Sequence, residues 1–600
     1  MRKLHPLQRN IQKIKWEKDS PFNTDFKDKF FQPNVIDETN DVFINANKLN
    51  QRWQQLNKDH FRIGELGFGF GLNFLITIAS WFKSNAQNKK WLDYISIDSF
   101  DFNIDDFNKV IKNYPEIKDF ADEFIKFLPI TNRGYTRINL SKYKVRLTLI
   151  MDDVDDALSS LLKNPNNQID AWYLDGFDPK NNKSMWSKSV INKISMLSKK
   201  DTTFGTYTAA GFVRRELEKN NFEVNKVKGF GNKRHKLIGK YKGSFSDSAP
   251  KSSGLRVAII GAGLSGTCLS YKLANQGVKV DLFEKNNRLD LNPLGSMYPK
   301  FSLDVDARSY LLTQAYFYSH NFYSSKYEGY MNTGIIFLNN SADRKFWIDR
   351  LLKLGRNDLF ELLTAKEINY QNKIDQPYDG LMVKIGGCVS IKDLSNQMLR
   401  NKNISLHNGY HFSDYKIGKN ISLNFNNGKK YDGYSHLIFC SGSSLQSLMP
   451  KIGIKHGAIV GIKNKNLEKI NSTINSNGYV LPKYSNLNWS GSIYSNQEIQ
   501  INNRASFKEI MKKNNNLLKD VYPEDVNASW SGARATLPDY MPVAGSLDKQ
   551  KVFVLGGLGS RGLSLAPLLA EMIMSDICGI TSPVSNKIRE AIDPKRFLVK

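Results

Sequence analysis

The sequence predicts an α/β protein with two halves, each built on a Rossmann-like arrangement of parallel strands and helices. First, short apolar runs alternate with amphipathic stretches before residue 242, in the order FRIGELG, LDYISID, VRLTLIM, DAWYLDGF and TTFGTYT. This alternation is typical of a doubly wound parallel sheet. Second, two glycine-rich fingerprints, at residues 65–71 and 261–266, each join an apolar strand to a helix. A chain of 600 residues also exceeds what one core normally holds.

A small, polar segment separates the two halves. The residues KGSFSDSAPKSSG, from Lys242 to Gly254, are broken by Pro250 and predict a linker. We therefore expect an N-terminal domain at 1–243, a linker at 244–253 and a C-terminal domain at 254–600. The second half begins with RVAIIGAG, LSYKLANQG and KVDLFEK, and returns late to a strand–glycine–helix pattern at VFVLGGLGSRGLSLAPLLAEMI. This order predicts an α+β substrate domain inserted into a nucleotide-binding domain.

Net charge, apolar runs and cysteine spacing indicate which kinds of partner, membrane or metal the protein can bind. The formal net charge of +27 attracts polyanions such as nucleic acid, although a composition rich in Lys, Asn and Ile explains it equally well. No apolar run is long enough to span a membrane, and the basic start MRKLHPLQRNIQKIKW lacks the apolar stretch of a signal peptide. The 4 cysteines are scattered, without the spacing of a metal site. We expect a cytoplasmic monomer that uses no metal and no membrane.

The first fingerprint places carboxylates where a dinucleotide site would need N–H donors. Glu65 precedes the glycines, Asp98 ends the strand LDYISID, and Asp153 follows the strand VRLTLIM. We expect these acids to contact the amino group, the ribose hydroxyls and the adenine of a ligand without phosphates. S-adenosylmethionine fits that description. The loop glycines would let the chain turn beneath the ligand without a Cβ clash, and they are Gly67, Gly69 and Gly71.

Two further acids follow the strand DAWYL. Asp175 lies where the carboxyl edge of a parallel sheet meets the ligand, so it is a candidate to align an amine or to accept its proton. The alternative is that it caps a turn or a helix. Capping is the preferred interpretation of Asp178.

Three blocks of the first half resemble a known family. They are GELGFGFGLNFL, DAWYLDGFDPKNNKSMW and TYTAAGFVRRELEKNNFEVNKVKGFGNKRHKL. They resemble the methyltransferase half of the bifunctional tRNA 5-methylaminomethyl-2-thiouridine biosynthesis family. The resemblance implies methyl transfer to an aminomethyl group on the wobble uridine of tRNA, with Asp175 as the catalytic acid. Asp178 replaces a residue that is usually small and apolar, so it receives no catalytic role. The basic run from Lys226 to Lys242 is either a phosphate-contact surface or a solvated face.

The second fingerprint predicts FAD. Gly261 permits the turn, Gly263 admits a pyrophosphate, Gly266 allows close helix–strand packing, and Glu284 ends the next strand, where it can hold ribose hydroxyls. Two later elements favour FAD over NAD. The first is the strand and turn HLIFCSGSS with Gly442. The second is the loop with Gly557, Gly559 and Gly562, which opens a helix whose positive end would stabilise reduced flavin.

Two arginines are candidates for substrate binding in this half. Residues 255–580 resemble the D-amino-acid-oxidase-like superfamily, and an arginine near Arg534 commonly binds the substrate carboxylate there. A guanidinium suits that role because it grips a carboxylate with two parallel hydrogen bonds. A structural salt bridge is the alternative for Arg534. Arg561 is expected to contact substrate or RNA.

Further blocks extend the resemblance to the oxidoreductase half of the same bifunctional family. They are LGSMYPKFS, IGGCVSI, SGARATLPDYMPVAG and GGLGSRGLSLAPLLAE. The resemblance implies FAD-dependent removal of a carboxymethyl group from 5-carboxymethylaminomethyl-(2-thio)uridine. The product would be the amine that the first half methylates. One alternative is a small-molecule amine or amino-acid oxidase fused to an unrelated methyltransferase. Another is a flavin-bearing RNA-binding protein without turnover.

Overall fold

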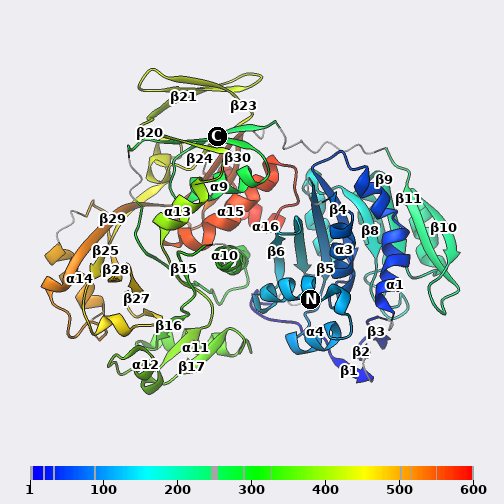
Figure 1. Ribbon diagram of the computed structural model, residues 1–600, viewed down its shortest axis with the longest axis horizontal. Helices are drawn as coiled ribbons and strands as arrows, with labels where there is room; N and C mark the ends of the chain where they lie inside the picture. The colour runs from blue at the N-terminus through cyan, green and yellow to red at the C-terminus, as the bar shows by residue number, and fades with distance from the viewer. Residues whose placement is uncertain are drawn as a thin grey trace. The chain divides into compact units, whose positions relative to one another are not determined.

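A computed structural model describes residues 4–17, 20–31, 34–86, 90–130, 132–244, 254–287, 291–325, 327–499, 503–514, 516–548 and 551–597. The chain divides into two compact units (Figure 1). The first in sequence, called here the methyltransferase-like unit, comprises Gln8–Lys251 and Cys578–Lys587. The other, called here the oxidase-like unit, comprises Met1–Leu7, Ser252–Ile577 and Ile588–Lys600. A division at the linker alone would therefore place Met1–Leu7 in the methyltransferase-like unit and Cys578–Lys587 in the oxidase-like unit, the reverse of what the structure shows. The predicted linker 244–253, apart from Ser244, lies outside the described residues.

An eight-stranded sheet forms the centre of the methyltransferase-like unit, in the order β10-β11-β9-β8-β4-β5-β7-β6. Five neighbouring strands are parallel, as the alternating apolar runs predicted. They are β9 (Ser198–Thr206), β8 (Ile169–Leu174), β4 (His60–Leu66), β5 (Trp91–Asp98) and β7 (Val145–Met151). The antiparallel strand β6 (Gly134–Leu140) lies at one edge, and the hairpin β10 (Phe222–Lys228) and β11 (His235–Tyr241) lies at the other. The central strands are buried on both faces, which explains their nearly continuous apolar sequence.

Helices cover both faces of this sheet, so it has two separate apolar cores. One core contains side chains of α1 (Val35–Thr39), α2 (Leu49–Gln54), α3 (Leu72–Lys83), α4 (Ile104–Ile111) and α5 (Lys118–Phe124). The other contains side chains of α6 (Val154–Leu162), α7 (Lys188–Met196) and α8 (Gly211–Lys219). A small antiparallel sheet precedes them, formed by β1 (Ile14–Glu17), β2 (Ser20–Asn23) and β3 (Asp28–Lys29).

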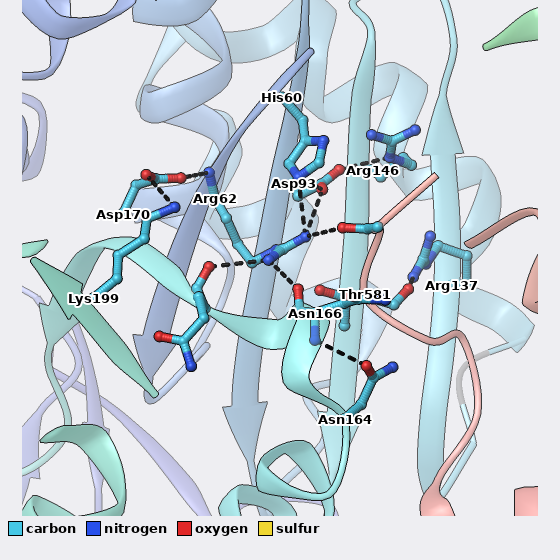
Figure 2. Close-up of polar contacts among 12 residues, drawn as sticks. His60, Arg62, Asp93, Arg137, Arg146, Asn164, Asn166, Asp170, Lys199 and Thr581 are labelled. Atoms are coloured by element: carbon cyan, nitrogen blue, oxygen red, sulfur yellow. Dashed lines mark hydrogen bonds and ion pairs between the residues drawn. The ribbon is translucent and has the colours of Figure 1, made fainter. Parts of the chain in front are cut away.

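The amino-terminal ends of the central strands hold a buried charge network (Figure 2). Asp93 on β5 accepts a hydrogen bond from Arg146 Nε at 2.6 Å and lies 3.5 Å from Arg62 Nη2. On β8, Asp170 pairs with Lys199 at 2.8 Å and accepts from the backbone N–H of Arg62 at 2.9 Å. Burial alone would raise the pKa of Asp93, but the neighbouring cations outweigh it and lower that pKa to about 2. The glycine loops follow the opposite ends of these strands, so this network is structural.

The late segment Cys578–Lys587, called here the strap, adds backbone acceptors to the same unit. Arg62 Nη2 donates to the carbonyl of Gly579 at 3.0 Å, and Arg137 donates to the carbonyl of Thr581 (Figure 2). The backbone N–H of Asn586 donates to Ser160 Oγ at 3.1 Å. Because both guanidiniums are buried, the strap supplies acceptors that water cannot replace there.

The oxidase-like unit contains a six-stranded sheet in the order β20-β13-β12-β24-β31-β30. Its strands are β20 (Ile404–Asn408), β13 (Lys279–Glu284), β12 (Arg256–Ile260), β24 (His436–Phe439), β31 (Val552–Gly556) and β30 (Val543–Asp548). All are parallel except β30. The helices α9 (Leu264–Asn275), α10 (Ala307–Ser324) and α15 (Gly562–Ile577) pack together beside this sheet (Figure 1). A buried triad joins the three helices, because Lys272 donates to both Glu571 and Tyr318.

The strands of a second large sheet come from two stretches of this unit, before β20 and after β24, within the region predicted to hold an inserted α+β domain. Its order is β17-β18-β16-β26-β27-β28-β25-β29. The strands are β17 (Phe360–Leu363), β18 (Gly380–Val383), β16 (Ile335–Leu338), β26 (Thr473–Asn475), β27 (Tyr479–Tyr484), β28 (Leu487–Ser495), β25 (Gly453–Ile462) and β29 (Val526–Thr536). The helices α11 (Ala342–Leu352), α12 (Ala365–Asn372) and α14 (Asn503–Asn514) accompany it, while α13 (Ile391–Leu399) packs on α9. Two three-stranded sheets complete the unit: β14 (Gly295–Met297) with β19 (Gly387–Val389) and β15 (Tyr330–Met331), and β21 (Phe412–Ile417) with β22 (Ile421–Phe425) and β23 (Lys430–Tyr434).

The short helix α16 (Asn586–Ile592) begins within the strap, and a 3₁₀ turn (Pro594–Arg596) follows it. In the part of the chain that the structure describes, no helix combines the length and apolar character needed to cross a membrane. The same residues contain no group of three or more His, Cys, Asp or Glu side chains suited to hold a metal ion.

Candidate functional sites

The first glycine loop lies between β4 and α3, as predicted. All three predicted glycines have positive φ, and Gly71 is the N-cap of α3. Gly67 faces a second loop closely: a Cβ at this position would lie 3.0 Å from the Cα of Gly176. The loop after β4 and the loop after β8 therefore touch through glycine backbone. A side chain at Gly67 would separate them.

The predicted acids hold this loop and its neighbours in different ways. Asp98 Oδ2 accepts from the backbone N–H of Gly69 at 3.0 Å, and its Oδ1 accepts from Phe100 at 3.0 Å. Burial raises the pKa of Asp98 despite these bonds. Asp153 instead caps α6, because its Oδ1 accepts from the N–H of Asp155 at 2.9 Å. Its predicted contact with adenine stays a prediction and would have to use the other oxygen.

Glu65 is buried beneath the loop, near the end of β4. Its Oε2 accepts a 2.6 Å hydrogen bond from Ser96, whereas Oε1 is buried with no hydrogen-bond partner among the described residues. Burial raises the pKa of Glu65 to about 8, and the charge of nearby Asp175 adds to the effect against the opposing bond from Ser96. A buried carboxylate oxygen without a donor suits a cationic ligand group.

Asp175 lies directly after β8, opposite the start of α3. Asn73, in the first turn of α3, donates to Asp175 Oδ2 at 2.8 Å and accepts from Thr39 Oγ1 at 2.8 Å. Burial raises the pKa of Asp175 to about 7, although the bonds from the Gly176 backbone and from Asn73 act to lower it. A carboxyl group with such a pKa exchanges protons readily near neutral pH, which suits a general base.

Three more side chains surround Asp175, and the sequence reasoning did not identify them. The hydroxyl of Tyr207, just after β9, is buried and has no hydrogen-bond partner among the described residues. Lys233 Nζ lies 4.1 Å from the centre of the Tyr207 ring and 3.4 Å from a carboxylate oxygen of Glu38. Asp175 and Glu38 both contribute to raising the pKa of Tyr207, after burial, which is the main cause.

Asp178 has the structural role that was preferred for it. Its Oδ1 accepts from the backbone of Lys180 at 2.8 Å, and its own N–H donates to Asp28 at 2.8 Å. The adjacent ring of Phe177 stacks on Phe26 with a centroid separation of 4.7 Å. Through these contacts the small β1–β3 sheet covers the loop that carries Asp175. Sequence periodicity gave no indication of this cover.

The basic run from Lys226 to Lys242 forms the edge hairpin β10–β11. Some of its cations are paired: Lys240 lies 2.6 Å from Asp201, Lys242 lies 3.2 Å from Glu223, and Lys236 pairs with Asp41. Others are exposed and form no ion pair with any described residue, namely Lys226, Lys228 and Arg234. This exposed set can contact phosphate.

The second glycine loop, between β12 and α9, has room for a phosphate. A Cβ at Gly263, the N-cap of α9, would meet no atom within 4 Å, whereas one at Gly261 would lie 2.6 Å from the carbonyl of Cys440. A Cβ at Gly266 would clash with the Gly261 carbonyl at 2.0 Å, so this glycine packs helix on strand as predicted. Glu284 Oε2 accepts from the N–H of Ala262 at 3.0 Å. These residues fit the pyrophosphate and ribose of FAD.

The later predicted FAD glycines border the same sheet. Gly442 follows β24 and begins a short 3₁₀ helix, and Gly557 follows β31; both have positive φ. Gly559 opens the 3₁₀ turn before α15. A Cβ at Gly562, the first residue of α15, would lie 3.6 Å from Leu264 at the start of α9. The loops that start α9 and α15 therefore lie side by side.

Arg534 on β29 is held beside aromatic rings. Its guanidinium lies 4.9 Å from the ring centre of Tyr494, and a Cβ at Gly457 would come within 2.8 Å of its Cζ. Its Nη1 is buried without a hydrogen-bond partner among the described residues. No described carboxylate forms an ion pair with Arg534, so the structural salt bridge considered for it is absent. Arg561 donates to the backbone carbonyl of Tyr540 at 2.9 Å.

The chain matches two family models. A family model described as FAD dependent oxidoreductase matches residues 256–575, which is more than half of the chain. The chain belongs to this family. A second model, described as S-adenosyl-L-methionine-dependent methyltransferase, matches residues 115–242. The predicted fold class and both predicted cofactors are confirmed.

The chain is also similar to curated proteins over nearly its whole length. The tRNA 5-methylaminomethyl-2-thiouridine biosynthesis bifunctional protein MnmC of Legionella pneumophila (strain Lens) is 27% identical, with 98% of this chain and 97% of that protein covered. The protein of the same name from Pseudoalteromonas atlantica (strain T6c) is 27% identical, with 97% of each covered. The crystal structure of glycine oxidase from Geobacillus kaustophilus matches with a TM-score of 0.45 and 19% identity, covering 54% of this chain and 95% of that one. The resemblance predicted from the sequence blocks is confirmed.

Proposed function

We propose that the protein modifies the wobble uridine of tRNA in two consecutive steps. The oxidase-like unit removes the carboxymethyl group from 5-carboxymethylaminomethyl-(2-thio)uridine to give 5-aminomethyl-(2-thio)uridine. The methyltransferase-like unit then converts this amine to 5-methylaminomethyl-(2-thio)uridine. The observation that carries the proposal is the match of both units, in one chain, to full-length relatives with that biosynthetic name. A fusion of two unrelated enzymes would not match one relative from end to end.

In the oxidation, the glycine-derived carbon loses a hydride and the nitrogen bonded to it loses a proton, so the C–N single bond becomes the C=N bond of an imine. Bound FAD supplies the hydride acceptor. Water adds to the imine carbon, the C–N bond breaks, and glyoxylate leaves with the former carboxymethyl carbons. Arg534 is proposed to grip the carboxylate through its unpartnered Nη1 and thereby orient the glycine-derived carbon. Gly261, Gly263, Gly266 and Glu284 are proposed to hold the cofactor, together with the later glycines Gly442, Gly557, Gly559 and Gly562.

In the methylation, the primary amine must be neutral to attack. Bound S-adenosylmethionine supplies the methyl group. Asp175 is proposed to accept the proton that the amine releases, because a pKa of about 7 leaves it about half ionised at neutral pH. Glu65 is proposed to face the amino group of the methyl donor, where a cation would favour its charged form. Asp98 and Asp153 are proposed to complete that site beside the loop glycines Gly67, Gly69 and Gly71.

We further propose that the protein acts as a monomer in the cytoplasm, where tRNA substrates are found. The exposed cations Lys226, Lys228 and Arg234 on the β10–β11 hairpin support contact with RNA phosphate.

Nucleoside analysis of tRNA from a strain lacking the gene tests the proposal. We expect 5-carboxymethylaminomethyl-uridines to accumulate and 5-methylaminomethyl-uridines to disappear. Re-expression of the intact chain should reverse both changes. Wobble uridines identical to those of the parent strain would refute the proposal.

A further inference from the structure

Tyr207 and Asp175 follow two neighbouring strands at the carboxyl edge of the methyltransferase-like sheet. The strands β8 and β9 are parallel, and Tyr173 on β8 pairs with Gly205 on β9. Asp175 and Tyr207 each come two residues after these partners, directly beyond the ends of the two strands. Because neighbouring strands lie about 4.8 Å apart, the two loops start side by side.

Direct contacts hold the Tyr207 ring next to the loop that carries Asp175. The ring of Trp186 is nearly perpendicular to that of Tyr207, with centroids 6.4 Å apart. Trp186 Nε1 also donates to the carbonyl of Phe177, two residues after Asp175, at 3.1 Å. Lys233 Nζ lies over the Tyr207 ring, 4.1 Å from its centre. The tyrosine ring is thus fixed by an aromatic neighbour and by a cation.

The short helix α1 supports both the cation over this ring and the carboxylate beside it. Glu38 lies 3.4 Å from Lys233 Nζ. The next residue, Thr39, donates to Asn73 at 2.8 Å, and Asn73 donates to Asp175 at 2.8 Å. Two consecutive residues of one helix therefore orient both groups before a substrate binds.

The hydroxyl of Tyr207 is buried and has no hydrogen-bond partner in the part of the chain that the structure describes. Such a group is costly unless a ligand supplies the missing partner. Burial, followed by the charge of Asp175, raises the pKa of Tyr207 well above its ordinary value, so the phenol stays protonated. It can then accept two hydrogen bonds and donate one. The site therefore offers an oxygen acceptor beside the Asp175 carboxylate.

These two acceptors match the two N–H groups of a primary amine. If Asp175 accepts one N–H and the Tyr207 oxygen accepts the other, the nitrogen lone pair is left to face the methyl carbon of the donor. The nitrogen then bonds to this carbon, and the sulfur–carbon bond breaks with its electron pair left on sulfur. One N–H proton passes to the Asp175 carboxylate, so a neutral secondary amine and a neutral thioether result.

The secondary amine no longer fits both acceptors. It keeps one N–H, and a second transfer again needs its lone pair towards the donor. If the N–H faces Asp175, the new methyl group lies against the Tyr207 oxygen and leaves that buried hydroxyl unpaired. If the N–H faces Tyr207, the methyl group lies against Asp175 and no proton can be accepted there. Either arrangement should slow a second transfer by about 10- to 100-fold.

We propose that the Tyr207 hydroxyl accepts the second N–H of the substrate amine and thereby limits the product to one methyl group. This inference rests on the proposed function and deepens it, because it assigns the residue that restricts methyl transfer to a primary amine.

The test compares the intact protein with Tyr207→Phe, which removes only the hydroxyl. Single-turnover methylation is measured with tRNA that carries 5-aminomethyl-uridine and with tRNA that carries 5-methylaminomethyl-uridine, and the nucleosides are identified by mass. In Tyr207→Phe, the ratio of the second rate to the first should rise about 10- to 100-fold, with 5-dimethylaminomethyl-uridine as the new product. The matched control is Tyr135→Phe, which removes a hydroxyl that donates to Ser160 at 3.0 Å from the edge strand β6. It should keep the wild-type ratio.

Thermal stability is measured on the same preparations. Because the Tyr207 hydroxyl has no partner in the described protein, Tyr207→Phe should keep the wild-type Tm. A lower Tm without dimethylated product would show a structural role and overturn the inference. An unchanged ratio of rates in Tyr207→Phe, with 5-aminomethyl-uridine still methylated, would also overturn it while leaving the proposed function intact. A wild-type protein that does not methylate 5-aminomethyl-uridine in tRNA would instead refute the proposed function itself.

Discussion

The hydrogen bond from Asn73 to Asp175 should set the pH at which methyl transfer begins. Asn73→Ala removes a donor to the carboxylate, and a hydrogen bond to a charged group is worth about 1.5–3 kcal/mol. At 1.36 kcal/mol per unit, its loss raises the pKa of Asp175 by about 1 to 2 units above its present value of about 7. Because the base must be ionised, the rising limb of the pH–rate profile moves to higher pH.

The size of the effect follows from the ionised fraction. At pH 7 about half of Asp175 is ionised in the wild type, and about one tenth to one hundredth would be ionised in Asn73→Ala. Methyl transfer should therefore fall about fivefold to fiftyfold at pH 7, and the difference should shrink to about twofold or less at pH 9. The assay is single-turnover methylation of aminomethyl-tRNA at saturating S-adenosylmethionine from pH 6 to pH 9.5.

Two variants make this experiment decisive. Thr39→Val removes only the hydroxyl that donates to Asn73 Oδ1 and leaves the bond from Asn73 to Asp175. It should therefore shift the midpoint of the pH–rate profile less than Asn73→Ala does. Asn108→Ala, on the exposed side of α4, should not shift it. A midpoint for Asn73→Ala equal to that of the wild type would refute the role of this hydrogen bond. A rate reduced by the same factor at every pH would show that Asn73 acts through folding or binding.

Three further predictions concern residues with distinct roles. Asp175→Ala should slow methylation about 10²- to 10⁴-fold, so that aminomethyl-uridine accumulates while flavin reduction by tRNA continues; loss of both steps would show that the sites are not separable. Arg534→Gln should lower kcat/KM for oxidation about 100-fold, with Arg534→Lys intermediate, and unchanged kinetics would exclude carboxylate binding there. Asp93→Asn should destabilise the methyltransferase-like unit by about 3–5 kcal/mol, or about 6–20 °C in Tm, because Arg146 loses its buried counter-charge. Folding lowers the pKa of Asp93 from 3.8 to about 2, so its charge stabilises the unit above pH 4. The difference in unfolding stability between wild type and variant should therefore shrink as the pH falls towards 2; a constant difference in calorimetry would contradict this.

The sequence was sufficient to predict the features that depend on local pattern. Strands buried on both faces read as nearly continuous apolar runs, so β4, β5, β7 and β8 were recognisable. The more polar β9 was recognisable only by its second half, TTFGT. Glycine turns marked where ligands were expected to approach. The positive φ values of Gly67, Gly69 and Gly71 agree with the reason for which glycine was expected there. These features need no knowledge of distant residues.

Features that depend on contacts across long stretches of chain were not predictable. The strap meets Arg62 and Arg137 more than 400 residues away, and its short sequence CGITSPVSNK carries no periodicity. Tyr207 and Lys233 reach Asp175 only because β9 pairs with β8 and the β10–β11 hairpin folds back onto β9. Asn73 had one usable signal, since it is a polar residue at the start of the otherwise apolar helix LNFLITIASWF. For Asp153 the sequence signal had two meanings. An acid after a strand can contact a ligand, but it can equally begin the next helix, as Asp153 does at α6.

We expect two sites in this one chain to act consecutively on one nucleoside. This expectation is tested by incubating purified protein with tRNA that carries 5-carboxymethylaminomethyl-uridine, with and without S-adenosylmethionine, and quantifying nucleosides and glyoxylate over time. Without the methyl donor, we predict that 5-aminomethyl-uridine accumulates with one glyoxylate per uridine; adding the donor then converts it to 5-methylaminomethyl-uridine. Methylation of the carboxymethylaminomethyl group before any glyoxylate appears, or oxidation that needs S-adenosylmethionine, would contradict the account.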